Sequence, residues 1–358
     1  MPSEHKQYNL PETPPAVTSN IVYTGDASVV KDGSLKSPNY APGTAGWSIN
    51  SDGTAEFTGV TVDGYVVQSK GSFGGDGSDG ALDTSSSAIN IDLGNANVVT
   101  KNYTSVNIAT NNLTFTNPST NGTIVILKSQ GNVVVSASIV ASSLGGAGGA
   151  AGTATNVGFV GDGGHTTMLG RSNYGVGATV NTTDAGTSFG AGGAAITYLK
   201  EITSSGIRVA CGAGGGGGAG GSTGAGAAGG RGGGAVIIEC GGALNFSGTI
   251  TTAGDVGSNS AGSAGGAGGA GGGGAGGSIV VLYKTLTANT GTLTVTGGAG
   301  GTGGAGTGTN DTGGGGGGGG HITAGANGTE SARATGDGGN GGNGGNGQSL
   351  VAVNTLIA

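Results

Sequence analysis

Long tracts built almost wholly from glycine most constrain what this chain can fold into. The stretch SAGGAGGAGGGGAGG, at residues 263–277, has no side chain larger than that of serine. Ordering each glycine costs on the order of 1–2 kcal/mol of backbone entropy, and no side chain is buried in return. Such a tract is therefore either a flexible linker or part of an unusual ordered architecture.

The glycines divide the chain into two parts. Of the 90 glycines among the 358 residues, 15 lie in residues 1–140 and 75 in residues 141–358. Collagen needs glycine at every third position with abundant proline, whereas all seven prolines of this chain precede residue 119. A collagen triple helix is therefore excluded.

Within the tracts, the residues other than glycine recur at every third position. This is the repeat of the polyproline II conformation, which glycine can adopt and which forms no internal hydrogen bonds. Its bare N–H and C=O groups need partners in neighbouring segments. We expect polyglycine II arms that bond laterally, and the alternative is a set of flexible linkers. The recurring residues are Leu144, Ala147, Ala150 and Thr153; Ala219, Ser222, Ala225, Ala228 and Arg231; Ala261, Ala264, Ala267 and Ala270; Ala299, Thr302 and Ala305; and Asp337, Asn340, Asn343 and Asn346.

Four apolar segments and a shortened fifth copy read alike and indicate a repeat. Each full copy has a β-branched strand, a polar turn and a second alternating strand. The unit is roughly forty residues with two longer excursions, which is typical of a parallel β-solenoid or β-helix whose turns bury each other's apolar faces. Alternating strands in residues 88–120 suggest that the solenoid begins near residue 80. The aligned positions are Ile124, Ile196, Val236, Ile279 and Leu350.

Charge and cysteine content exclude several kinds of partner. A net charge of −7 with only 12 scattered Lys and Arg argues against nucleic acid and against insertion into an anionic membrane. Residues 1–20 lack the apolar stretch of a secretory signal, and no apolar run is long enough for a membrane span. Cys211 and Cys240 predict buried thiols, stacked on adjacent turns of the solenoid, rather than a disulfide.

A second signal lies near the N-terminus, in GTAGWSINSDGTAEFTGVTVDGYVV at residues 43–67. A strand with Trp47, an Asp-Gly turn at Asp52 and Gly53, and an alternating strand through Phe57, Val60 and Val62 predict a hairpin. The amino-acid sequence of this stretch closely resembles a segment of tail-tip, host-specificity and tail-fibre proteins of tailed bacteriophages, where the segment typically leads into a fibre. That resemblance implies a tail-attachment segment over residues 1–70.

The rest of the chain is similar in pattern to the glycine-rich receptor-binding adhesins of T-even-like phages, in which polyglycine II helices pack into a sandwich. The resemblance implies an all-β protein of the virion tail, commonly a homotrimer, that binds a host surface polysaccharide or outer-membrane protein and meets other tail proteins through residues 1–70. We expect a β-rich entry at 71–140 and a glycine-rich solenoid at 141–358. The alternative is a self-assembling structural filament or a bacterial surface protein.

No motif indicates catalysis or a cofactor. The three histidines, His5, His165 and His321, lie far apart in sequence, and no nucleophile elbow, zinc signature or P-loop occurs. The stretches 74–83 and 336–347 resemble calcium-binding repeats but lack the ligand pattern of either known type. We therefore expect a binding protein without catalytic residues, metal or cofactor; a polysaccharide-cleaving pair of carboxylates would have to converge from different turns.

Receptor contact is expected on the excursions that interrupt the repeat. Residues 156–190 concentrate aromatic and basic side chains, the usual anchors of recognition surfaces, although these side chains could instead pack the loop onto the solenoid. The second excursion, 307–335, adds a weaker group that includes Asn327 and Glu330. The candidate receptor-binding residues are Phe159, His165, Met168, Arg171, Tyr174, Phe189, His321 and Arg333.

Overall fold

The structure, a computed structural model, divides the chain into two compact units, Met1–Val67 and Gln68–Ala358. The described residues contain strands and extended segments but no helix. The all-β class predicted from the sequence is therefore confirmed for them. The described residues are 21–24, 27–30, 34–37, 39–42, 44–50, 54–57, 73–153, 165–166, 170–171, 174–181, 190–192, 209–307, 311–332 and 334–354.

The first unit contains two small antiparallel sheets. Strands β1 (Ile21–Thr24) and β2 (Ala27–Val30) pair with each other, and β3 (Ser34–Lys36), β4 (Trp47–Asn50) and β5 (Ala55–Phe57) form a three-stranded sheet. Trp47 lies opposite Phe57, so the predicted pairing of these two strands is present. The predicted turn at Asp52 and Gly53, and Val60 and Val62, lie outside the described residues.

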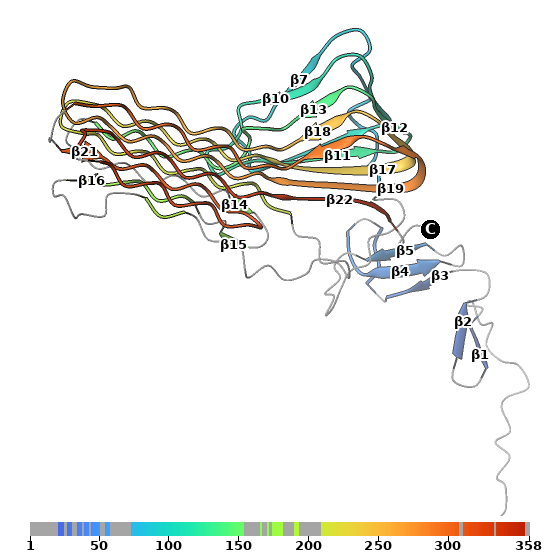
Figure 1. The fold of residues 1–358 in the computed structure, drawn as a ribbon. Helices are drawn as coiled ribbons and strands as arrows, with labels where there is room; N and C mark the ends of the chain where they lie inside the picture. Colours follow the sequence, from blue (N-terminus) through green and yellow to red (C-terminus); the bar gives the residue numbers. More distant parts are fainter. Residues whose placement is uncertain are drawn as a thin grey trace, which may run out of the picture. The chain divides into compact units, whose positions relative to one another are not determined.

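The second unit is organised by three ladders of parallel strands (Figure 1). The chain visits them in the same order on successive passes, as in β8–β9–β10 followed by β11–β12–β13. The first ladder contains β8 (Val98–Tyr103), β11 (Ile124–Ser129), the first halves of β17 (Ala235–Phe246) and β19 (Ser278–Asn289), and β22 (Gln348–Val353). The second contains β6 (Ala81–Asp83), β9 (Ser105–Ile108), β12 (Val133–Val135) and the second halves of β17 and β19. The third contains β7 (Ile89–Asp92), β10 (Leu113–Thr116), β13 (Ser138–Val140), β18 (Thr249–Thr251) and β20 (Thr292–Thr294).

The core lies between the ladders, where equivalent apolar side chains stack from strand to strand. In the third ladder Leu113, Ile139 and Ile250 are aligned and buried. In the second, Val133 and Leu244 are aligned and buried in the same way. Each such side chain contributes roughly 1.5–3 kcal/mol on burial, which explains why one pass of strands needs its neighbours.

The register of the repeats differs by one residue from the sequence alignment at two places. The structure pairs Val236 with Ile279 as predicted, but Val236 with Val125 rather than Ile124, and Ile279 with Ser349 rather than Leu350. The segments at both places have consecutive apolar residues, so alternation alone cannot specify which residue faces the core. The predicted copy around Ile196 lies outside the described residues.

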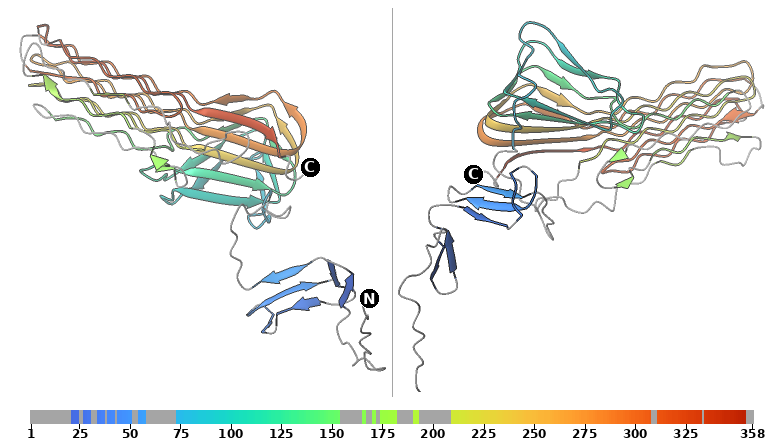
Figure 2. Two further views of the ribbon diagram at one scale, coloured as in Figure 1. Left: turned by 90° about the horizontal axis from the view of Figure 1, so that it is seen from below. Right: turned by 180° about the vertical axis from the view of Figure 1, so that it is seen from behind.

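Extended glycine-rich segments, here called arms, run from one side of the ladders (Figures 1 and 2). Their backbone hydrogen bonds repeat every third residue: Gly212, Gly215 and Gly218 donate to Gly233, Gly230 and Ala227, at 2.8–2.9 Å. Arm 211–221, which contains these three donors, also accepts backbone hydrogen bonds from arm 144–153. The lateral bonding predicted from the sequence is present among these arms, which argues against flexible linkers. The arms are 144–153, 174–179, 211–221, 225–233, 254–262, 267–277, 296–307, 313–320, 324–330 and 338–347.

The arms use glycine because neighbouring backbones leave no room for a Cβ atom. A Cβ at Gly145 would lie 2.5 Å from three backbone atoms in two other arms, and one at Gly152 would lie 2.7 Å from the nitrogen of Gly220. Neither glycine has a positive φ, so backbone freedom is not the reason. Close packing of arms therefore explains the composition.

Two predictions about local structure need correction. The three-residue period continues through tight turns, so one tract yields two antiparallel arms, as where Gly221 donates to Gly224 at 2.7 Å. Both cysteines are buried and unbridged as predicted, but Cys240 belongs to the main core and Cys211 to a small cluster with Ile124 and Ala235. They are therefore not stacked on each other, because Cys211 lies on an arm and Cys240 on a strand.

Candidate functional site

Several of the turns that join the arms gather at the end of the bundle that lies away from the ladders. In Figure 1 the short antiparallel pair β16 (Val180–Asn181) and β21 (Thr312–Gly313) marks this end. Next to β21, the carbonyl of Asp311 accepts a hydrogen bond from the Ser222 N–H at 2.8 Å. We call this the distal end, defined by turn residues 221–224, 263–266, 332 and 334–337 together with Thr307.

Short hydroxyl side chains connect these turns. The Thr223 and Ser263 hydroxyls hydrogen-bond each other across two turns, and the Thr307 hydroxyl donates to the Ala264 carbonyl at 3.0 Å. The Ser222 hydroxyl accepts from the Gly266 N–H at 3.0 Å. The turns therefore form one hydrogen-bonded surface.

The turn at residues 332–337 completes the distal end. Ala332 and Asp337 exchange backbone hydrogen bonds, and the Thr335 hydroxyl donates to the Asp337 carboxylate at 2.7 Å. The Gly306 N–H donates to the other oxygen of that carboxylate at 2.9 Å. These bonds lower the pKa of Asp337, with the Gly306 bond as the largest cause. The carboxylate is thus a structural acceptor, and Ala332, Ala334 and Thr335 remain exposed around it.

The predicted receptor-binding residues that the structure describes do not gather at one place. His165 in β14 (His165–Thr166) pairs in register with Arg171 in β15 (Gly170–Arg171), and both strands lie nearer the ladders than the distal end (Figures 1 and 2). Tyr174 is 43% exposed on the flank of the bundle. Phe159, Met168, Phe189 and Arg333 lie outside the described residues.

His321 does not fit a receptor contact, because its side chain is fully buried. Its Nε2 atom lies 3.0 Å from the Ala210 carbonyl oxygen and 3.3 Å from the Ser278 hydroxyl. An N–H at Nε2 can donate to that carbonyl, which leaves Nδ1 as the buried acceptor. Nδ1 has no hydrogen-bond partner among the described residues. Burial lowers the pKa of His321 to about 4, so the ring is neutral at pH 7.

Within the described residues, parts of both predicted excursions are arms rather than loops. In the first, Gly175 and Ala178 donate at 3.0 Å to Gly214 and Gly217 of a neighbouring arm. In the second, residues 313–320 are entirely buried within the bundle. Additional arms, whose glycines need close neighbours, therefore account for part of the longer spacing between strand repeats.

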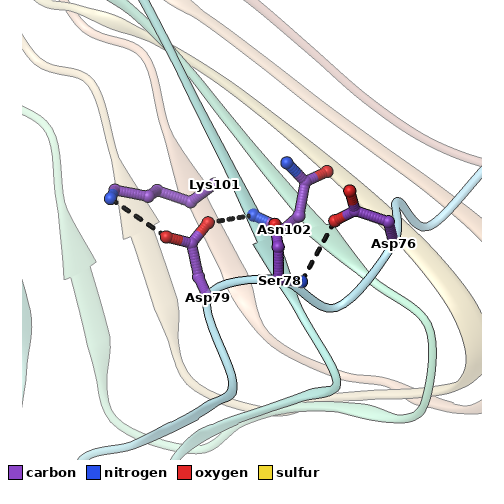
Figure 3. Close-up of polar contacts among 5 residues, drawn as sticks. All are labelled: Asp76, Ser78, Asp79, Lys101 and Asn102. Atoms are coloured by element: carbon purple, nitrogen blue, oxygen red, sulfur yellow. Dashed lines mark hydrogen bonds and ion pairs between the residues drawn. The ribbon is translucent and has the colours of Figure 1, made fainter.

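The aspartates at residues 74–83, considered above as calcium ligands, have structural partners (Figure 3). Asp79 accepts from the Asn102 N–H at 2.7 Å and from Lys101 at 3.2 Å, and Asp76 accepts from the Ser78 N–H at 3.0 Å. Hydrogen bonding lowers the pKa of Asp79, chiefly through Asn102, and that of Asp76, chiefly through Ser78. Within the described part of the chain, no group of three or more His, Cys, Asp or Glu could hold a metal ion.

The Gly-Gly-Asn triplets near the C-terminus have a role that sequence reasoning missed. Their side-chain oxygens cap the backbone of the neighbouring arm 296–307: Asn340, Asn343 and Asn346 accept from Gly303, Gly300 and Gly297 at 2.8–3.0 Å. The period-three placement of an acceptor side chain was the available signal. We call Asp337, Asn340, Asn343 and Asn346 the capping row.

Threonine hydroxyls in turn accept hydrogen bonds from the backbone N–H groups of the first and last asparagines of the capping row. The Thr329 and Thr323 hydroxyls accept from the N–H groups of Asn340 and Asn346 at 2.7 and 2.6 Å. Ala326 holds the matching position beside Asn343, to which it donates its own N–H at 2.8 Å, but it has no hydroxyl.

We therefore expect Ala326→Thr to stabilise the bundle. A hydroxyl at this exposed position would accept from the Asn343 N–H, and one such bond contributes about 0.5–1.5 kcal/mol. The measurement is the denaturant midpoint of the full chain, with Ala326→Val as the control of similar shape that lacks the hydroxyl. Equal midpoints for the Thr and Val variants would contradict the predicted cap.

Comparison of the chain with protein-family models, curated proteins and solved structures finds no significant match in any of the three. Among the described residues, no helix is long and apolar enough to cross a membrane.

Proposed function

We propose that the second unit is a β-solenoid braced by a polyglycine II bundle. The regular order in which the chain visits three parallel ladders supports the solenoid. The three-residue spacing of hydrogen bonds, together with extended backbone and buried glycines, supports polyglycine II. In this architecture the strands anchor the arms, and the arms hold their turns in fixed positions.

We further propose that the protein is a receptor-binding protein of a phage tail, a tail fibre or tip adhesin, that acts by binding without catalysis. The observation that carries this proposal is the convergence of turns at the distal end, where hydrogen bonds between turns hold an exposed surface in place. A preformed surface binds with a smaller loss of conformational entropy than mobile loops. Its partner would be a host surface polysaccharide or an outer-membrane protein.

The first unit suits attachment to other tail proteins, as the resemblance of residues 43–67 implies. On one face of its three-stranded sheet, Trp47 and Ile49 alternate with inward residues and lie opposite Phe57 and Ala55. Ile49 is 40% and Phe57 48% exposed, so this face offers apolar area to a partner. A homotrimer, or a complex with another tail protein, would cover it.

Cell binding by the full chain tests the distal end. Ala264→Arg combined with Ala334→Arg adds bulk and charge at two exposed distal positions, and we expect it to weaken binding to susceptible cells by about tenfold or more. Ala299→Arg, at an exposed position on an arm's flank, is the matched control and should bind as the unmodified chain does. If the double variant binds normally while Tyr174→Ala does not, the receptor contact lies on the flank and the distal assignment is wrong.

A further inference from the structure

One edge of the arm bundle is closed by side chains of the last arm, 338–347. The backbone of this arm donates to arm 296–307 from Gly338, Gly341 and Gly344 at 2.8–3.0 Å, and its asparagine side chains accept from arm 296–307 in return. Arm 296–307 directs three rows of N–H groups outward, because successive residues point in three directions. In one row, Gly298, Gly301 and Gly304 donate at 2.8–3.2 Å to the backbone carbonyls of arm 267–277. The next row, Gly297, Gly300, Gly303 and Gly306, donates instead to the capping row, at 2.8–3.0 Å.

The capping row stands where the carbonyls of a further arm would stand. Elsewhere in the bundle, arms bond in both orientations through backbone atoms alone: arm 144–153 runs parallel to arm 211–221 and antiparallel to arm 225–233. An exposed row of N–H groups at three-residue spacing therefore fits any other glycine arm, whatever its direction. The nearest source of such arms in solution is a second copy of this chain.

We propose that Asp337, Asn340, Asn343 and Asn346 terminate the lattice, because they occupy the edge at which a glycine arm of a second copy would otherwise dock. The device is the counterpart of the charges and bulges that protect the edge strands of β-sheets from adding another strand. Without the caps this edge would allow self-association, and the chain covers it with its own side chains. The proposal does not rest on receptor binding.

The choice of residues fits this role. A cap needs only an oxygen acceptor opposite the backbone N–H group, and the side chains of both Asp and Asn supply one. Asp337, at the end of the row, caps in the same way, because its carboxylate accepts from the Gly306 N–H and also from the Thr335 hydroxyl. The other three positions carry the neutral amide, which avoids a line of like charges about 9 Å apart.

The test compares N340A/N343A/N346A with the unmodified full chain by sedimentation velocity over a range of concentrations. We expect the variant to form larger, concentration-dependent species, with self-association strengthened about tenfold or more because three donors are uncovered. N340D/N343D/N346D keeps the acceptors and should sediment like the unmodified chain. Both variants are measured in about 1 M salt, where repulsion between the added charges is screened.

Amide hydrogen exchange provides a second readout that does not depend on association. Loss of the cap in N343A should speed exchange at Gly300 by about tenfold or more, while Gly301, which donates to an arm, stays protected. This single variant also serves if the triple variant does not fold. The proposal is overturned if the folded triple variant sediments like the unmodified chain, or if Gly297, Gly300 and Gly303 exchange freely in the unmodified chain. Neither result would bear on cell binding.

Discussion

Replacing Gly145 by alanine is expected to destabilise the protein by about 3 kcal/mol or more, the largest effect that we predict for one methyl group. The added Cβ would lie 2.5 Å from the carbonyl oxygens of Gly212 and Gly233 and from the carbonyl carbon of Gly232. All three are backbone atoms of two arms, so no side chain can rotate away. Relief requires that the arms separate, which would break hydrogen bonds such as the 2.7 Å bond from the Gly145 N–H to the Gly232 carbonyl.

The free energy of unfolding, measured by denaturant titration, checks this prediction. The reverse change in the same arm, Ala147→Gly, is the control and should cost roughly 0.5–1 kcal/mol, because it adds only backbone freedom. In an ordinary linker, Gly→Ala would be neutral or slightly stabilising. A Gly145→Ala variant as stable as the unmodified chain would therefore show that the arms are not packed as described.

Acidification from pH 6.5 to pH 4 is expected to remove up to about 3 kcal/mol of stability through His321 alone. Burial lowers the pKa of this ring to about 4 in the folded protein, compared with the usual value of 6.5. Between these values the unfolded chain binds a proton that the folded protein does not. The contribution is therefore fully present above pH 6.5, decreases as the pH falls through this window, and is absent below pH 4.

The measurement is the free energy of unfolding as a function of pH for the unmodified chain and for His321→Gln, which keeps an N–H donor for the Ala210 carbonyl. The variant should lose the pH dependence between 6.5 and 4, whatever its stability at pH 7. The aspartates with lowered pKa values, such as Asp79 and Asp92, contribute mainly below this window, because their usual pKa is already 3.8. Parallel curves for the two proteins would show that His321 is not the responsible group.

Several features followed from the amino-acid sequence alone. Period-two alternation of apolar residues predicted the strands. The alternating strands in residues 88–120 predicted a stack that begins near residue 80, and β6 begins at Ala81. The period-three placement of residues other than glycine predicted laterally bonded arms, because a bare extended backbone must find partners. The strands and the arms both depend on local periodicity, which can be read directly from the sequence.

Tertiary structure decided the features that depend on which segments meet. It determined the strand register, since consecutive apolar residues at Ile124 and Val125 permit two alignments. It buried His321, which the sequence predicted as a receptor contact on the second excursion. The tertiary structure also determined the role of the capping row, because its three asparagines can accept hydrogen bonds from arm 296–307 only when that arm lies beside them.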